Sequence, residues 1–472
     1  MRRQEQRAIA KKIGEGQLGK GARLISNFET QDAIRLANDG ELPMGEGIHA
    51  ANPEDLLELF PAGPAYEKHT PAPAPFQFDT QDNAYLFAAV DSASKGTSSA
   101  HSAWSNELLG ELLKEQPEEL GALLTTLINL LIAGKLTARD LWTYRRVSMF
   151  AKKDFTPANR SCRAITIQEV LLNLGGRMLQ MAHEEGIIDL MESQGQLGQG
   201  TEDGTGTVVS ILSMVYQAMQ YDDNERRPQQ RPVSLSNSVT AAAAAAAATE
   251  SAQQNSSMSA RSPDPHQMSS NPSPPNPTHV SQLNPHAELF TPQSEELCIG
   301  VLDIRKGYNT VDINKAREMA LIHFPGTVAY IDWLYSTPSP IRNSKGQTVA
   351  MLATGTPTGD PMSGLLFNLS TLSALEAARE EGAFTLAIID DIYVFGPIST
   401  VARALPRMVQ KLGVCGLSLN PAKCKFLCKN EVEGARLLPG DIPRFSDGID
   451  VVSIPVGCDE FVKSGTERIL RS

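Results

Sequence analysis

The pattern of apolar and polar positions separates the chain into two periodic regions with a long aperiodic segment between them. Leucines recur at helical spacing over residues 105–133, which predicts a buried helical face, and Pro117 divides this stretch into two helices. Further helices are expected over about 168–185 and 206–220. Proline interrupts residues 59–76 repeatedly, so this stretch is expected to be extended.

The aperiodic segment covers residues 222–290 and differs in composition from the rest of the chain. Eight consecutive alanines, Ala241–Ala248, lie among serine, glutamine, asparagine and proline, and aliphatic core-forming residues are scarce. A segment that buries little apolar surface does not offset the entropy lost on ordering. We therefore expect a disordered insertion that carries no chemistry.

Periodic sequence resumes after this segment. The apolar run Leu297–Leu302 predicts a buried strand that ends at Asp303, a helix is expected over about 312–324, and a strand over about 348–353. If the strand that ends at Asp303 and the strands around Asp390 and Asp391 are neighbours in one sheet, these acids converge at one edge.

Two further elements have clear local signals. Asp360 is a favourable N-cap and Pro361 takes the first helical position, so a helix is expected to begin there. Two apolar runs over 384–396 then flank Asp390 and Asp391, which predicts a β-hairpin with both acids at its turn.

Charge is distributed unevenly along the 472 residues, whose net charge is −12. Residues 25–134 hold 17 acidic and 4 basic residues, whereas residues 135–163 hold eight basic residues and two acids, with aromatics between them. Such a mixture suits a phosphate backbone and stacked bases, although a solvated helix face is the commoner origin of a charge run. The basic residues are Lys135, Arg139, Arg145, Arg146, Lys152, Lys153, Arg160 and Arg163.

The remaining composition bears on compartment. The chain is 41% hydrophobic, which is typical of globular proteins, and it contains no run of 18 apolar residues and no apolar segment after its basic start. Its six cysteines are scattered, and Cys424 and Cys428 lack the spacing of a zinc site. We expect a soluble, intracellular protein with reduced thiols and no membrane partner.

Three carboxylates are candidates for chemistry. Asp303 ends a buried strand, and Asp390 and Asp391 lie at the tip of the predicted hairpin. Carboxylates brought together repel one another unless a cation neutralises them, and Mg²⁺ prefers carboxylate oxygens. Two such ions would activate a hydroxyl and stabilise a leaving pyrophosphate. The alternative for Asp390 and Asp391 alone is a polar turn, where aspartate is common.

Four segments in order resemble the palm motifs of retroelement reverse transcriptases, most like those of non-LTR retrotransposons. They are LDIRKGYNTVD (302–312), TPTGDPMSGLLFNLS (356–370), AIIDDIYVFG (387–396) and GLSLNPAKCKFL (416–427). One such motif is a weak signal, but four in the family's order and spacing are a strong one. Upstream, three segments are similar to the fingers of these enzymes: SASKGTSSAHSAWSNELL (92–109), FAKKDFTPANRSCRAITI (150–167) and QLGQGTEDG (196–204).

The resemblance implies an α+β fold: a right-hand polymerase palm, in which an antiparallel sheet carries helices on one face, plus fingers and the long disordered insertion. The implied division is an extension over 1–89, fingers over 90–221, the insertion over 222–290, a palm over 291–450, and the start of a palm–thumb border over 451–472. A strand pair is expected within 451–465, with nothing helical and basic after it. The thumb is therefore expected to be absent, which would make extension weak and distributive.

The resemblance also implies the chemistry of the palm. Asp303 and Asp390 would bridge two Mg²⁺ ions, with Mn²⁺ as an alternative, Asp391 would lie beside them, and the Ile304 carbonyl would be a backbone ligand. The nucleophile would be a primer 3′-hydroxyl. Lys423 would protonate the departing pyrophosphate, or it is an ordinary surface lysine. The implied partners are an RNA template, a DNA primer and deoxynucleoside triphosphates, with nuclear localisation by resemblance alone.

Substrate contacts are assigned in the same way. Lys152 or Lys153, together with Arg163, would hold the triphosphate. Tyr308 would pack under the sugar and exclude a 2′-hydroxyl, or it is an ordinary half-buried tyrosine. Gly359, Asp360 and Pro361 would shape the turn on the template side.

The chain departs from the family at several positions. Thr358 stands where many members have glutamine, Ala164 replaces a proline after the fingers arginine, and Ile388 stands where an aromatic is frequent. Pro406 is expected to interrupt a helix. The tripeptide Tyr221–Asp223 spells the family's best-known motif, but it follows a helical segment and lacks flanking apolar strands, so we reject it as the hairpin.

Three functions are consistent with these patterns. The leading hypothesis is an RNA-directed DNA polymerase. The second is a catalytically silent remnant that binds nucleic acid, which the three intact acids argue against. The third is an RNA-templated RNA polymerase, which Tyr308 argues against because RNA synthesis needs room for the 2′-hydroxyl.

Overall fold

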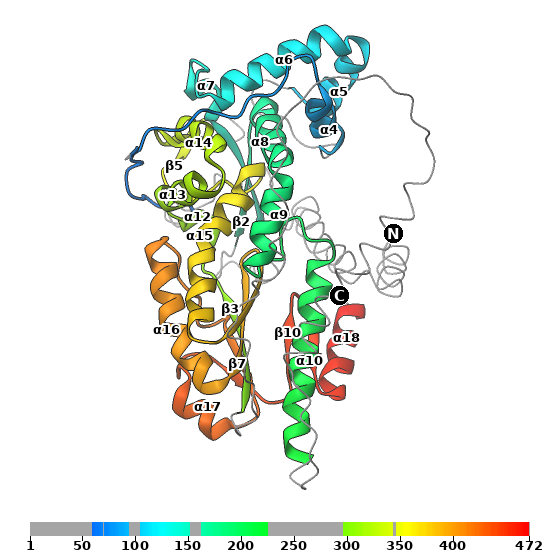
Figure 1. The fold of residues 1–472 in the computed structure, drawn as a ribbon, viewed down its shortest axis with the longest axis vertical. Helices are drawn as coiled ribbons and strands as arrows, with labels where there is room; N and C mark the ends of the chain where they lie inside the picture. Colours follow the sequence, from blue (N-terminus) through cyan, green and yellow to red (C-terminus); the bar gives the residue numbers. More distant parts are fainter. Residues whose placement is uncertain are drawn as a thin grey trace, which may run out of the picture. The chain divides into compact units, whose positions relative to one another are not determined.

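The computed structural model describes residues 59–68, 70–93, 104–151, 162–224, 296–342 and 346–471, with the backbone alone described for 148–151, 162, 163, 221–224 and 471. The chain divides into two compact units, Met1–Val209 with Leu297–Ser472, and Ser210–Glu296. The first unit contains all the strands described here together with helices, so the fold class is α+β, as the sequence predicts (Figure 1).

A five-stranded sheet forms the centre of the part that follows residue 296. Its order is β6–β7–β3–β8–β9, with β3 flanked by antiparallel β7 and β8. Strand β9 runs parallel to β8, so the expected antiparallel sheet is mixed at this edge. The strands are β3 (Leu297–Asp303), β6 (Phe384–Ile388), β7 (Asp391–Pro397), β8 (Lys425–Cys428) and β9 (Arg444–Phe445).

Helices α15 (Pro361–Glu380) and α16 (Ile398–Val414) lie side by side and pack against strands of this sheet (Figure 1). As predicted, α15 begins with Asp360, whose side chain accepts a hydrogen bond from the Met362 amide. The expectation that Pro406 interrupts a helix is wrong, because α16 continues through it. Proline costs the helix a hydrogen bond, but the exposed position of Pro406 and the buried apolar face of α16 offset that cost.

A second sheet joins segments that lie far apart in the sequence. Its order is β2–β1–β4–β5, and β1 runs parallel to β4. The strand predicted over 348–353 is present as β5, which pairs with β4 in this sheet. The strands are β1 (Arg145–Ala151), β2 (Cys162–Ile167), β4 (Ser339–Arg342) and β5 (Thr348–Leu352).

Helices form most of the remainder before residue 225. The predicted break at Pro117 is confirmed, because one helix ends at Glu115 and the next begins at Pro117. Helix α10 (Gly204–Asn224) includes Tyr221–Asp223, so this tripeptide is helical and not a hairpin. The other helices are α4 (Ala84–Asp91), α5 (Asn106–Glu115), α6 (Pro117–Ile132), α7 (Arg139–Thr143), α8 (Val170–Ala182) and α9 (Glu184–Ser193).

The extended segment that precedes these helices packs on α13 (Ile313–His323) and α14 (Val328–Tyr335). Tyr66 donates a hydrogen bond of 2.5 Å to Asp332, and Arg317 contacts the same carboxylate at 2.6 Å. Arg317 also donates to the carbonyl of Thr70. A buried ion pair thus fixes the proline-punctuated stretch, which is extended as predicted.

Strands β10 (Gly448–Val451) and β11 (Ile454–Gly457) form the pair expected near the C-terminal end of the sequence. A helix, α18 (Asp459–Arg471), follows and packs against β11. Its three acidic and three basic residues balance, so it is not the helical and basic segment whose absence the sequence predicts. Phe461 lies over Gly448, where a Cβ atom would come within 2.5 Å of its ring. The described helices include none that combines the length and the apolar character needed to cross a membrane.

Candidate active site

The structure brings Asp303, Asp390 and Asp391 to one end of the five-stranded sheet. Asp303 and Asp391 are the last pair in the antiparallel register of β3 and β7. Residues directly opposite in such a pair project from the same face, with Cβ atoms about 4.5–5.5 Å apart. Asp390 occupies the turn between β6 and β7. The hairpin predicted for these acids is therefore present.

The electrostatics reflect this crowding. Burial, together with the charges of Asp390 and Asp303, raises the pKa of Asp391 to about 7, whereas Lys423 opposes the shift. Lys423 comes from the fourth motif, and its Nζ lies 3.8 Å from the Asp303 carboxylate. Its side chain is 60% exposed, so water screens this pair.

The donor set suits a divalent cation. Neighbouring carboxylates disfavour one another's ionisation. A hard divalent cation bound between them stabilises the ionised form, because such cations prefer oxygen ligands. Asp303, Asp390 and Asp391 would hold such an ion. Within the described part of the chain, no three His, Cys, Asp or Glu side chains already stand in an arrangement that could hold a metal ion, and Cys424 and Cys428 form no disulfide.

The first and fourth motifs lie against each other through backbone hydrogen bonds. The Asn420 amide donates to the Asp303 carbonyl at 2.8 Å, and the Arg305 amide donates to the Ser418 carbonyl at 2.8 Å. Ile304, the expected backbone ligand, is buried and forms a bridge with Leu419. These contacts place Lys423 beside the strand that ends in Asp303.

Tyr308 lies on the short helix α12 (Gly307–Thr310), next to the acids. Its ring stacks on Phe367 of α15, with centroids 4.8 Å apart and planes 17° apart. Gly307 makes this stacking possible, because a Cβ atom there would come within 2.6 Å of the Phe367 ring. Burial raises the pKa of Tyr308, and the charge of Asp390 adds to the effect. The sequence predicts a role for Tyr308 in the site but none for Phe367, because Phe367 looks like one more apolar residue of a buried helix.

The turn at Gly359 is fixed against strand β2. Gly359 has a φ of 104°, and a Cβ atom there would lie 2.6 Å from the Thr166 carbonyl oxygen, so only glycine fits. The Thr358 hydroxyl donates to the Ala164 carbonyl at 2.6 Å, and the Thr166 amide donates to the Thr358 carbonyl at 3.0 Å. Thr358 and Ala164, two positions that depart from the family pattern, therefore contact each other.

Asp360 faces the interior as well as capping its helix. Its carboxylate lies 3.7 Å from the guanidinium of Arg145, and both side chains are almost fully buried. Burial raises the pKa of Asp360, while Arg145 lowers it. Arg145 also donates to the Thr143 carbonyl at 3.0 Å. Asp360 thus ties the turn to strand β1, and Pro361 follows it at the start of α15.

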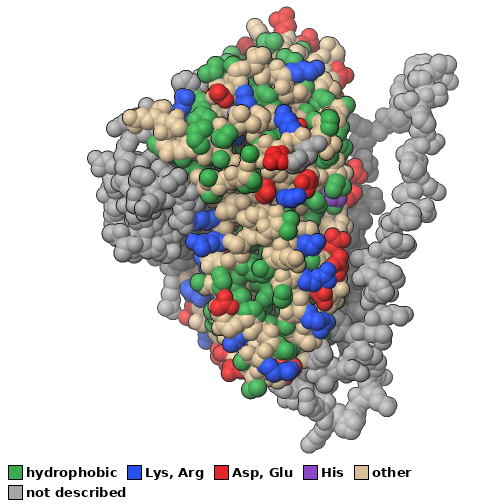
Figure 2. All heavy atoms as spheres, turned by 90° about the vertical axis from the view of Figure 1, so that its left-hand side faces the viewer, with side chains coloured by type: hydrophobic (Ala, Val, Ile, Leu, Met, Phe, Trp, Pro, Cys, Tyr) green, Lys and Arg blue, Asp and Glu red, His purple; other side chains and the backbone are tan. Residues whose placement is uncertain are grey.

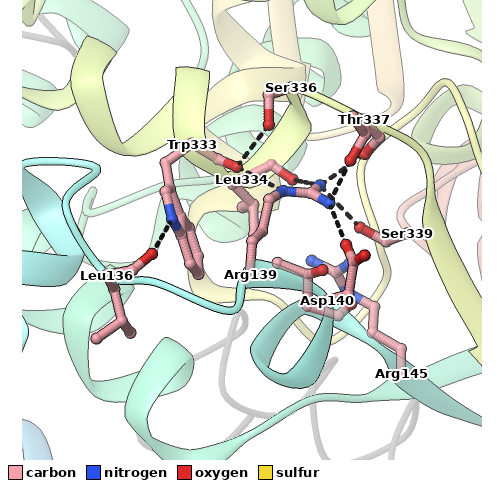
Figure 3. Close-up of polar contacts among 10 residues, drawn as sticks. Leu136, Arg139, Asp140, Arg145, Trp333, Leu334, Ser336, Thr337 and Ser339 are labelled. Atoms are coloured by element: carbon pink, nitrogen blue, oxygen red, sulfur yellow. Dashed lines mark hydrogen bonds and ion pairs between the residues drawn. The ribbon is translucent and has the colours of Figure 1, made fainter.

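The structure changes the interpretation of the basic stretch 135–163. Arg139 donates to the carbonyls of Trp333, Leu334 and Thr337 and to the side chains of Thr337 and Ser339 (Figure 3). Because Arg139 and Arg145 are occupied by intramolecular partners, they do not form part of a surface for a polyanion. Arg146 remains half-buried on β1.

The residues predicted to hold the triphosphate are less well described. Lys152 and Lys153 lie outside the described residues. Only the backbone of Arg163 is described, on β2, where it pairs with Phe150. The triphosphate contact therefore stays a prediction. On the face seen in Figure 2, basic side chains are interspersed with acidic and apolar ones.

The raised pKa of Asp391 predicts a pH dependence of stability. In the cation-free folded protein this carboxyl keeps its proton up to about pH 7, whereas its ordinary pKa is 3.8. The folded state therefore binds more protons, so the free energy of unfolding should fall as pH rises from about 4 to about 7, by at most roughly 4 kcal/mol. Thermal melts with a chelator would measure this fall. Asp391→Asn should flatten it, and an equal slope in both proteins would contradict the assignment.

Comparison with known proteins shows which family this part of the chain resembles. Residues 225–445, which include all four motif segments, match the family model described as reverse transcriptase (RNA-dependent DNA polymerase). This part of the chain is therefore similar to reverse transcriptases. The chain is 29% identical over 144 residues to a protein of Bradysia coprophila, the retrovirus-related Pol polyprotein from type-1 retrotransposable element R2. The match covers 28% of this chain and only 16% of that polyprotein.

Proposed function

We propose that this chain is an RNA-directed DNA polymerase that extends a DNA primer on an RNA template with deoxynucleoside triphosphates. The observation that carries the proposal is the register pairing of Asp303 with Asp391, with Asp390 in the adjoining turn. In this assignment the five-stranded sheet is the palm. The four-stranded sheet and the helices packed near it are the fingers.

The reaction would be attack of the primer 3′-hydroxyl on the α-phosphorus of the nucleotide, with release of pyrophosphate. Asp303, Asp390 and Asp391 would hold divalent cations, Mg²⁺ or Mn²⁺, which when bound lower the pKa of the hydroxyl and balance the charge that develops on the phosphates. The Nζ of Lys423 could donate a proton to the departing pyrophosphate. The Ile304 carbonyl is the candidate backbone ligand.

Substrate selection would come from the residues around Tyr308 and Gly359. Tyr308 is held flat by Phe367 and lies close enough to Asp390 for that charge to raise its pKa. A rigid ring there would exclude a 2′-hydroxyl. Gly359 would let the backbone approach the template side, while Asp360 and Pro361 fix the start of the helix beneath it. Lys152, Lys153 and Arg163 are proposed for the triphosphate on the resemblance alone.

Primer extension tests the proposal against its alternatives. The full chain is incubated with an RNA template, an annealed DNA primer and Mg²⁺, with either deoxy- or ribonucleotides. Extension with deoxynucleotides supports the proposal. Extension with ribonucleotides supports an RNA polymerase, and binding without extension supports the silent remnant. Nuclear localisation stays a prediction.

Tyr308→Val is expected to weaken sugar discrimination. The smaller side chain leaves space for the 2′-hydroxyl, so ribonucleotide incorporation relative to deoxynucleotide incorporation should rise by about 10- to 100-fold. Single-nucleotide incorporation with each substrate gives the ratio. Phe367→Leu, which keeps Tyr308 but removes the ring beneath it, should raise the ratio less. An unchanged ratio in Tyr308→Val would remove Tyr308 from the sugar site.

A further inference from the structure

The turn that carries Asp390 is held by a side chain from a distant segment. Gln196 is completely buried, and its amide contacts both backbone polar groups of Ile389, the residue before Asp390. The Ile389 amide donates to Gln196 Oε1 at 2.9 Å, and Gln196 Nε2 donates to the Ile389 carbonyl at 3.1 Å. Gln196 therefore fixes the orientation of the peptide groups on both sides of Ile389.

Ile389 needs such support because its backbone conformation is unfavourable. Its φ is +57°, in the left-handed region that β-branched residues rarely adopt. Residues in this region persist where the surroundings over-determine them, and they cluster at functional sites. The two hydrogen bonds from Gln196 act directly on this residue, and Asp390 follows it in the chain.

The neighbouring backbone holds Gln196 in register with the hairpin. The Leu197 amide donates to the Ala387 carbonyl at 2.7 Å, and the Ala387 amide donates to the Gly195 carbonyl at 2.8 Å. At Gly195 and Gly198 a Cβ atom would come within 2.6 Å of hairpin backbone, at Thr385 and Ile389 respectively. The segment thus lies directly along the outer edge of β6 and ends beside the turn.

The alternative is that Gln196 is an ordinary buried glutamine, whose hydrogen bonds only compensate for the burial of its own amide. Two observations favour a specific role. Both functional atoms of the amide contact one residue, and that residue is the strained position immediately before a candidate metal ligand. Gln199, in the same segment, instead accepts a hydrogen bond from Asn368 of α15 at 2.9 Å.

We propose that Gln196 is a positioning residue that sets the turn at Ile389 and thereby holds Asp390 in place for cation binding and primer extension. The proposal rests on the proposed function. It adds a residue that precedes helix α10 to a site that is otherwise built from residues after position 296.

The test replaces Gln196 by methionine, which preserves length but removes both hydrogen bonds to Ile389 and the hydrogen bond of 3.2 Å that Gln196 Oε1 accepts from the Gly198 amide. Hydrogen exchange of the full chain, without cation, should show the hairpin peptide over 384–396 exchanging about tenfold faster, as expected for loss of hydrogen bonds of ordinary strength. The dissociation constant for Mn²⁺, measured by electron paramagnetic resonance, should rise about 10- to 100-fold, the usual effect of losing a group that orients a metal ligand. Gln199→Met is the matched control and should change neither quantity.

A second change separates positioning from general stability. Glycine adopts a positive φ without strain, so Ile389→Gly in the Gln196→Met background should recover part of the Mn²⁺ affinity. Faster exchange confined to the hairpin, with recovery in the double variant, supports the proposal. Uniformly faster exchange across the chain, or unchanged exchange in the hairpin, overturns it.

These readouts remain distinct from a failure of the proposed function. If the wild-type chain extends no primer, the polymerase assignment fails. The exchange measurement needs neither cation nor catalysis, so it still decides whether Gln196 sets the turn.

Discussion

Asp303→Asn and Asp390→Asn are each expected to abolish primer extension, with a decrease of about 1,000-fold or more, because each removes a charge that would hold a cation and stabilise the transferring phosphate. Asparagine has nearly the same volume as aspartate, so the fold should persist. Single-turnover extension on an RNA template gives the rate, and circular dichroism reports the fold. Asp303 ends β3 and Asp390 lies in the hairpin turn, so the two variants test separate elements of one site.

Asp222→Asn is the matched control for these variants. Asp222 belongs to Tyr221–Asp223, the tripeptide with the same sequence as the best-known reverse transcriptase motif, but it lies within helix α10. Extension by this variant should equal that of the wild type. Loss of activity in Asp222→Asn, or its retention in Asp390→Asn, would show that the hairpin over 384–396 is not the active turn.

Arg145→Met is expected to lower the free energy of unfolding by about 3–5 kcal/mol, because it leaves the buried carboxylate of Asp360 without its counter-charge. Arg145→Met combined with Asp360→Asn should be less destabilising, since asparagine removes the orphaned charge and remains a good N-cap. Denaturant unfolding of the full chain measures both changes.

Arg407→Met is a suitable comparison because Arg407 pairs with Glu380 and Glu381 on the surface, at a side-chain exposure of 44%. Exposed pairs of this kind contribute about 0–1 kcal/mol. Equal losses in Arg145→Met and Arg407→Met would show that the pair between β1 and the start of α15 contributes no more than a surface contact.

The elements with strong local signals could be predicted from the sequence. Asp360 and Pro361 define the start of α15 through capping and backbone geometry, and the apolar run before Asp303 defines β3. Tertiary packing decided the cases in which prediction failed. The helix around Pro406 persists because its apolar face is buried.

The acids of the site could be predicted, but the residues that hold them could not. Asp303, Asp390 and Asp391 follow recognisable strands, so their types and positions carry the signal. Gln196 contacts Ile389 across 193 residues of sequence, and no local pattern encodes such a pairing. The same holds for the pairing of Arg145 with Asp360. The charge count places Arg145 in a basic stretch, and capping explains only part of the role of Asp360, although both side chains are buried.

The parallel pairing of β1 with β4 has a consequence for the order in which the chain folds. About 170 residues separate β2 from β4, and shortening this connection to about 100 residues would change the closure free energy by only about 0.5 kcal/mol. The length of this connection therefore has little effect on stability, but it sets the time between the synthesis of β1 and the synthesis of β4. At roughly 5–20 residues per second, β1 leaves the ribosome about 10–40 seconds before its partner strand. During that interval Arg145 and Arg146 keep the open edge of β1 charged, which discourages pairing with other chains. We therefore expect Arg145, which is buried in the folded protein, to protect the nascent strand from association until β4 and Asp360 have been synthesised.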